Sequence, residues 1–190
     1  MKSKSITIYG KHISLQLMKC EDISQYYKNG FESPDQEVQR YTGTKHIATE
    51  EEIRAYVEHI VEDDSRYDFL IISSEGQIIG ESVINEIDAD NRCANFRIAL
   101  FKNEYCGQGI GTEAIQMTLE FGFEKLNLHR IELEVFGFNK RAYAAYRRAG
   151  FIEEGRKREA EFIDGQYCDV IIMGILHDEY SNGDYLIKVM

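Results

Sequence analysis

The chain has 190 residues, of which 43% are hydrophobic, and it carries a formal net charge of −11. This composition predicts a single globular domain and excludes a disordered chain, and the stretch 177–190 is expected to be a polar tail. The negative charge argues against nucleic acid as a partner. It would attract a cationic partner, such as a protonated amine, and it fits simple solubility equally well. No apolar run reaches the roughly 20 residues that span a bilayer, and no apolar segment follows the basic N-terminus, so we expect a cytoplasmic protein that binds no membrane.

The first half of the chain predicts helices and hairpins. Residues 13–17 alternate like a half-buried strand, and residues 23–27 predict a short helix. The run Ser33-Pro34-Asp35-Gln36 predicts a helix that starts with Ser33 as its cap. A second capping box at Thr49 precedes an amphipathic helix over 53–61. Two period-two segments, 69–72 and 78–84, flank a turn and predict a hairpin.

The second half predicts strands and helices in alternation. Strands are expected at 95–100 and 131–135, and helices at 110–121 and 142–149, with Gly150 ending the second helix. Two last strands, 151–163 and 167–176, join at 164–165. Hairpins followed by strand–helix–strand units predict an α/β (α+β) domain with mixed strand pairing.

Three glycines, Gly107, Gly109 and Gly111, lie at alternate positions between a predicted strand and a predicted helix. Glycine lets a bulky anion come close to the backbone, and the helix that follows offers unpaired N–H groups and the positive end of its dipole. The loop therefore predicts a binding site for a pyrophosphate group.

Two nucleotide motifs can be tested against this loop. A Walker A loop requires a lysine that Gly111-Thr112 lacks. The stretch 109–114 fits the dinucleotide pattern G-x-G-x-x-A, and Glu132 lies about 20 residues further on. Against that pattern, residues 102–106 separate the strand from the first glycine, and the chain has few strand–helix–strand units. A dinucleotide-binding oxidoreductase stays an alternative.

Several motifs in order resemble the GNAT superfamily of acetyl-CoA-dependent N-acetyltransferases. They are the loop 107–114, Asn139-Lys140-Arg141-Ala142 leading to Tyr146, Gly150-Phe151, Glu154-Gly155 and the stretch 162–167. Asn127-Leu128-His129-Arg130 is similar to the branch with ribosomal-protein N-terminal and spermidine acetyltransferases. The resemblance covers about residues 12–176, the expected core, and implies a single-domain GNAT fold, a mixed, mostly antiparallel sheet of about seven strands flanked by about four helices. It also implies a homodimer as a candidate assembly.

The resemblance implies a set of residues that bind acetyl-CoA as co-substrate. Leu100 and Phe101 would pair with the pantetheine arm, and one of their N–H groups could serve the oxyanion. Asn139 would touch the cofactor and also cap its helix. The pyrophosphate would be held by backbone amides of Gly107, Gln108, Gly109, Ile110, Gly111 and Thr112. Cys106 stands where relatives usually have Gln or Arg, and Asn95 where they often have Glu.

Tyr146 is the expected general acid for the leaving thiolate. Periodicity alone favours a Tyr packed on the apolar face of its helix, whereas the resemblance favours the catalytic role. Glu86 is the first candidate for the general base, ahead of Glu81 and Glu134, and a water relay is the alternative. A covalent intermediate on Cys106 is a further alternative, although nothing near it in the sequence indicates its base.

The acceptor is expected to be a polyamine, a peptide N-terminal amine or another small amine. A different class of function, an acyl-CoA-binding sensor without turnover, also fits the sequence. We expect no metal, because the five histidines are scattered and the four cysteines form no C-x-x-C pair.

Overall fold

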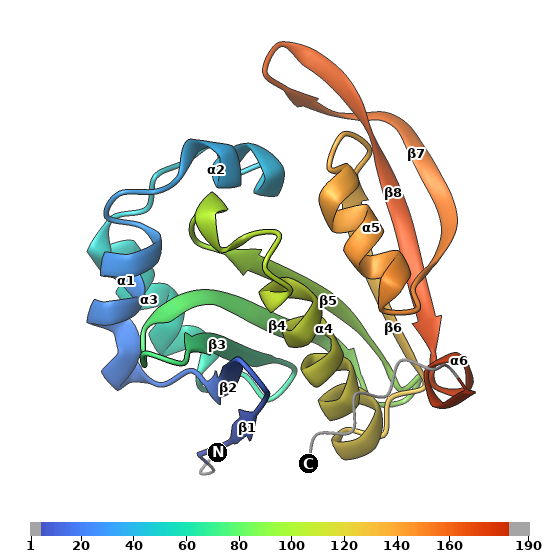
Figure 1. Ribbon diagram of the computed structural model, residues 1–190, viewed down its shortest axis with the longest axis horizontal. Helices are drawn as coiled ribbons and strands as arrows, with labels where there is room; N and C mark the ends of the chain where they lie inside the picture. Colours follow the sequence, from blue (N-terminus) through green and yellow to red (C-terminus); the bar gives the residue numbers. More distant parts are fainter. Residues whose placement is uncertain (1–4, 183–190) are drawn as a thin grey trace.

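The computed structural model describes residues 5–182 of the chain, and this part holds eight strands and six α-helices (Figure 1). The strands are β1 (Thr7–Tyr9), β2 (Ile13–Leu17), β3 (Tyr67–Ser73), β4 (Ile78–Asp88), β5 (Cys93–Leu100), β6 (Arg130–Phe136), β7 (Ile152–Ile163) and β8 (Gln166–Leu176). The α-helices are α1 (Ile23–Gly30), α2 (Gln36–Thr42), α3 (Glu50–Ile60), α4 (Ile110–Glu120), α5 (Lys140–Arg148) and α6 (His177–Asn182). The shorter helical segments are the 3₁₀ helices η1 (Cys20–Asp22) and η2 (Asn103–Tyr105) and the π-helix η3 (Phe121–Lys125).

All eight strands form one sheet in the order β1-β2-β3-β4-β5-β6-β8-β7. Among the described strands, every neighbouring pair is antiparallel except β5 and β6. That parallel pair covers only Cys93–Asn95 against Arg130–Glu132, so the two strands separate beyond Asn95. Figure 1 shows the result, two arms of sheet that diverge from a common base. A single parallel pair excludes the doubly wound sheet that a dinucleotide fold needs.

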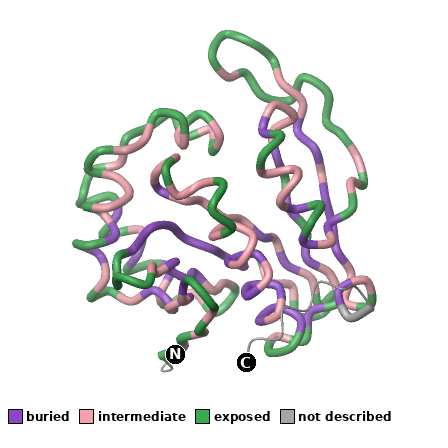
Figure 2. Tube along the Cα trace, in the orientation of Figure 1, coloured by how far each residue is buried: buried purple, intermediate pink, exposed green. Residues whose placement is uncertain are grey.

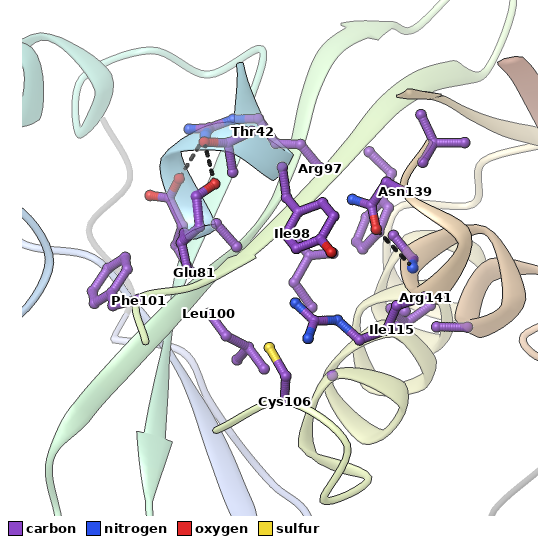
Figure 3. Close-up of a pocket in the computed structure, with 18 of the residues that line it drawn as sticks. Thr42, Glu81, Arg97, Ile98, Leu100, Phe101, Cys106, Ile115, Asn139 and Arg141 are labelled. Carbon is purple, nitrogen blue, oxygen red and sulfur yellow. Dashed lines mark hydrogen bonds and ion pairs between the residues drawn. The ribbon is translucent and has the colours of Figure 1, made fainter. Parts of the chain in front are cut away.

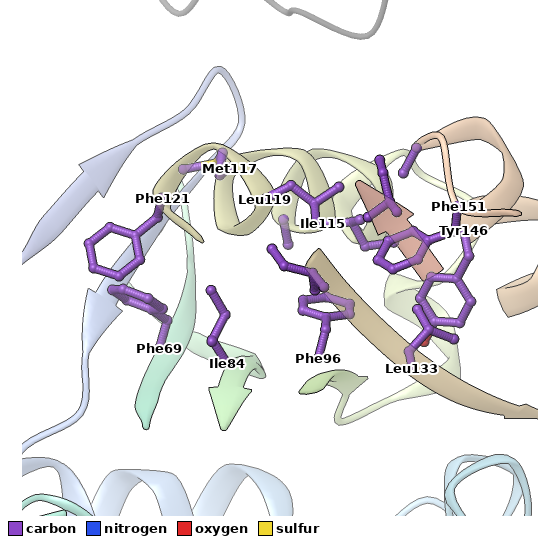
Figure 4. Packing of buried hydrophobic residues seen from close by; sticks show 14 of the residues in the cluster. Phe69, Ile84, Phe96, Ile115, Met117, Leu119, Phe121, Leu133, Tyr146 and Phe151 are labelled. Atoms are coloured by element: carbon purple, nitrogen blue, oxygen red, sulfur yellow. The ribbon is translucent and has the colours of Figure 1, made fainter. Parts of the chain in front are cut away.

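Helices cover both faces of the sheet. One face carries α1 and α3, where Tyr26, Val57 and Phe101 belong to one buried cluster. The other carries α4 and α5, where Ile115, Phe96 and Tyr146 belong to a larger one (Figure 4). Figure 2 shows continuous burial along most of β4, whereas the tip of the β7–β8 hairpin is exposed. No helix among residues 5–182 is long and apolar enough to cross a membrane.

The predicted α/β domain is confirmed, and nearly all predicted elements appear. The sheet has one strand more than the seven expected, because the three-residue β1 pairs with β2. Six α-helices replace the four expected, and one of them, α6, covers the start of the stretch expected to be a polar tail. The rest of that tail, 183–190, lies outside the described residues.

The predicted start of α2 was wrong. Ser33 does not cap the helix, which begins at Gln36 with Asp35 as its cap. Asp35 Oδ1 accepts the N–H groups of Glu37 (2.9 Å) and Val38 (3.2 Å), which otherwise have no intrahelical partner. The capping box at Thr49 and the end of α5 before Gly150, whose φ is +103°, are confirmed.

Candidate active site

A cleft of about 1400 Å³ opens where β5 and β6 separate (Figure 3). In Figure 3, Glu81, Leu100 and Phe101 lie toward one side, and Asn139 and Arg141 lie toward the other. Because a gap between strands opens to both faces of the sheet, groups from the α4–α5 face and from the α1–α3 face line the same cavity.

The glycine loop forms one end of this cleft. Gly107 and Gly109 have φ values of +78° and +86°, a conformation that favours glycine, and a Cβ at either would meet no atom within 4 Å. Because α4 starts at Ile110, the N–H groups of 109–112 have no acceptor inside the helix. The open loop and the positive helix end therefore fit an anionic group. All the expected loop residues line the cleft except Ile110, whose side chain packs against the core.

Leu100 and Phe101 both line the cleft, but their backbone N–H groups point in opposite directions. The Phe101 N–H donates to the Ile79 oxygen (2.9 Å), so it is part of the β4–β5 ladder. Hydrogen-bonded and open pairs alternate in an antiparallel ladder, so Leu100, opposite Gly80, and Ile98 turn their N–H groups toward the gap. The N–H groups that can reach a ligand are therefore those of Leu100 and Ile98, and the Phe101 N–H cannot serve the oxyanion.

Tyr146 and Asn139 come from α5 on the opposite arm. Asn139 Oδ1 accepts the Ala142 N–H (3.1 Å) and so caps the helix, and the residue also lines the cleft. The Tyr146 side chain is 7% exposed, and its ring packs edge-on to Phe96 and Phe151 at 6.3 and 5.8 Å.

The Tyr146 hydroxyl forms no hydrogen bond with residues 5–182, although the residue lines the cleft. Burial raises the pKa of this phenol above its ordinary value, so the hydroxyl keeps its proton at neutral pH. The sequence allowed two interpretations of Tyr146, a ring packed on the apolar face of its helix or a catalytic group. In the structure the ring is packed and the residue also lines the cleft.

Glu86 does not reach the cleft. The register of β4 against β5 shifts between Asn85 and Asp88, and Glu86, inside this bulge, has a φ of +54° and is exposed. The bulge takes Glu86 out of the alternation of β4, which explains why the residue is exposed. Glu134 does line the cleft, where it forms an ion pair with Lys157.

Glu81 is the buried carboxylate of the cleft, 5% exposed. Its Oε2 accepts the Tyr26 hydroxyl (2.5 Å) and its Oε1 accepts a guanidinium N–H of Arg97 (2.5 Å). Sequence reasoning ranked Glu81 below Glu86 and did not single out Tyr26 or Arg97. An acidic residue inside the apolar run 78–84 was the available signal, because a charge there requires a buried partner.

Helix α2 forms part of the wall of the cleft, and its cap Asp35 accepts the Asn103 N–H (2.9 Å) shortly before the glycine loop. Arg40 Nε donates to Asp164 Oδ2 (2.6 Å) at the tip of the β7–β8 hairpin. The Tyr41 ring lies 6.1 Å from Phe138, and the Arg141 guanidinium lies 5.0 Å above Tyr41. These contacts connect α2, on one arm, to the other arm across the mouth of the cleft.

Cys106 lines the cleft beside the loop, but its environment does not favour a nucleophile. Burial raises the pKa of its thiol, although the nearby Arg141 opposes the shift. The thiolate required for a covalent mechanism is therefore disfavoured. Among residues 5–182, no three His, Cys, Asp or Glu side chains lie close enough together to hold a metal ion.

Comparison with known proteins decides the family. A family model described as an acetyltransferase (GNAT) domain matches residues 12–152. The chain belongs to the GNAT family. The expected enzyme class, an acetyl-CoA-dependent amine N-acetyltransferase, is thereby confirmed, and the dinucleotide-binding alternative was wrong.

The relatives of this acetyltransferase come from the expected branch. It is 36% identical to the spermidine N(1)-acetyltransferase of Vibrio cholerae over 127 residues, which are 67% of this chain and 72% of that protein. It is 29% identical to the putative ribosomal N-acetyltransferase YdaF of Bacillus subtilis over 107 residues, 56% of this chain and 58% of that one. The crystal structure of the Vibrio cholerae spermidine N-acetyltransferase in complex with CoA and spermine has a TM-score of 0.81 at 27% identity, and the match covers 91% of this chain and all of that one.

Proposed function

We propose that this acetyltransferase transfers an acetyl group directly from acetyl-CoA to a small cationic primary amine, with Tyr146 as the general acid. The observation that carries the proposal is that Tyr146 lines the cleft while its hydroxyl has no hydrogen-bond partner among residues 5–182. A phenol in that state can donate to a group that enters the cleft.

The chain supplies the remaining parts of a direct transfer. The glycine loop holds the pyrophosphate, and the Leu100 and Ile98 N–H groups offer hydrogen bonds to the arm and to the carbonyl oxygen. The ammonium group of the bound acceptor first gives one proton to water. The neutral nitrogen then attacks the thioester carbon, the C–S bond breaks, and the leaving sulfur takes the Tyr146 proton. The second proton that the nitrogen loses, after the attack, passes to water, and a proton from solvent restores the phenol.

Carboxylates support a cationic acceptor. Asp35, Glu134 and Glu161 line the cleft together with the buried Glu81, on a chain with a net charge of −11. Spermidine, named for the relatives at 36% and 34% identity, and an N-terminal amine are both cationic at neutral pH.

Thermal stabilisation and turnover test the proposal together. The purified protein is heated with acetyl-CoA, CoA or NAD, and thiol release is then followed with spermidine, an amino sugar and short N-terminal peptides. We expect acetyl-CoA and CoA to raise the melting temperature, NAD to leave it unchanged, and at least one amine to release thiol. Stabilisation by acetyl-CoA without amine-dependent release would favour the sensor function instead.

A further inference from the structure

The Tyr56 hydroxyl, on α3, receives two guanidinium donors. Arg97 Nη2 donates to it at 2.8 Å and Arg66 Nη2 at 2.9 Å. A guanidinium group can only donate, so both lone pairs of the Tyr56 oxygen are engaged as acceptors. An ammonium group in the cleft would find no lone pair on this oxygen.

The Tyr56 proton is still available to an incoming group. No residue from 5 to 182 accepts a hydrogen bond from this hydroxyl, and Tyr56 lines the cleft. Burial raises the pKa of the phenol, although Arg97 opposes the shift, so the group keeps its proton at neutral pH. The hydroxyl is therefore a donor that requires an oxygen or another acceptor atom in the cleft.

Arg97 adds a second donor beside Tyr56. Its side chain is 42% exposed, and it is held by the carboxylates of Glu81 (2.5 Å) and Asp68 (3.7 Å). A guanidinium carries five N–H donors, so N–H groups are left over after these contacts. Its positive charge also opposes the binding of a second ammonium group at this position.

The position of this pair is on the acceptor side of the gap. Side chains alternate along β5, and Phe96 packs with the α4–α5 cluster, so Arg97 faces α1 and α3. Arg97 adjoins Ile98, whose backbone N–H faces the gap where the thioester would lie. An acceptor amine placed at the gap would therefore have Arg97 and Tyr56 beside it.

We propose that Tyr56 and Arg97 form an oxygen-binding subsite that selects primary amines with a carbonyl or hydroxyl oxygen close to the nitrogen, a refinement that rests on the proposed amine acetylation. The subsite discriminates against plain alkylamines, because a bound amine without an oxygen would cover these donors and leave them without an acceptor. It also discriminates against a polyamine whose inner ammonium group would have to lie beside Arg97.

A matched pair of acceptors tests the subsite. Glycinamide and propylamine are similar in size, but only glycinamide has an oxygen near the amine. Their kcat and KM values are measured by thiol release at equal concentrations of the free base, with the wild type, Tyr56→Phe and Tyr27→Phe. Tyr27 packs beside the α1–α3 cluster outside the cleft, so its variant controls for the loss of a phenol.

We expect the wild type to favour glycinamide through a lower KM, and Tyr56→Phe to lower the glycinamide-to-propylamine ratio of kcat/KM about 3- to 10-fold. Tyr27→Phe leaves the ratio as it is. An unchanged ratio in Tyr56→Phe, equal losses on both amines, or a wild type that favours propylamine would overturn the subsite. Turnover of neither amine nor any other by the wild type would instead contradict the proposed function itself.

Discussion

Replacement of Tyr146 by Phe tests the proposed acid directly. The substitution keeps the ring that packs on Phe96 and Phe151 and deletes one oxygen that has no hydrogen-bond partner among residues 5–182. The fold therefore loses no hydrogen bond, and we expect the free energy of unfolding to change by less than about 0.5 kcal/mol.

The expected effect is on turnover alone. A positioned general acid contributes about 10²- to 10⁴-fold, so kcat should fall at least about 100-fold, or about 2.7 kcal/mol of transition-state stabilisation. Because burial raises the Tyr146 pKa above its ordinary value, deprotonation of this phenol should cause no loss of wild-type activity between pH 7 and 9. The assay is thiol release at saturating acetyl-CoA, with melting temperature and CoA affinity measured on the same preparation.

Two results would refute the reasoning. A kcat within about twofold of the wild type would show that the leaving thiolate takes its proton from elsewhere. A loss of turnover accompanied by a lower melting temperature or weaker CoA binding would show that the residue acts through packing.

Three further substitutions test the loop, the thiol and the core. Gly109→Ala forces a residue with a side chain into a φ of +86°, which costs about 1–2 kcal/mol. Acetyl-CoA should therefore bind roughly tenfold more weakly in a calorimetric titration. Unchanged affinity would contradict the assignment of the loop to the pyrophosphate. Cys106→Ala should keep kcat within about twofold, because burial disfavours the thiolate that a covalent mechanism requires. Abolished turnover would restore that mechanism. Gly122→Ala places a Cβ 2.7 Å from Ile131 Cδ1 and should lower the free energy of unfolding, measured by urea denaturation, by about 1–3 kcal/mol. An unaltered urea midpoint would show that the surrounding side chains move to make room for the methyl group.

Local signals in the sequence were sufficient for most elements. The capping box at Thr49, the alternation over 131–135 and Gly150 after α5 each depend on residues a few positions apart, and all three appear as predicted. The glycine loop belongs to the same class, because a helix N-terminus after glycines is a local arrangement.

The errors have tertiary causes. Asp35 displaced Ser33 as the cap of α2, and its second oxygen accepts the Asn103 N–H (2.9 Å) from a loop 68 residues away. The strand β1 has only three residues, Thr7–Tyr9, too few for a periodic signal, and forms because β2 offers an edge. Glu86 is exposed because a bulge in β4 takes it out of the alternation of the strand.

The sequence by itself determined the fold class, the family and the glycine loop before α4, since each follows from short-range spacing and motif order. The tertiary structure alone decided which groups face the cleft. Three of these groups come from three different elements: Glu81 from β4, Arg97 from β5 and Tyr56 from α3. They form their hydrogen bonds with one another only after the sheet has formed. Side-chain direction across a sheet depends on register and bulges, and the gap depends on how far β5 and β6 pair, which a single sequence does not encode locally.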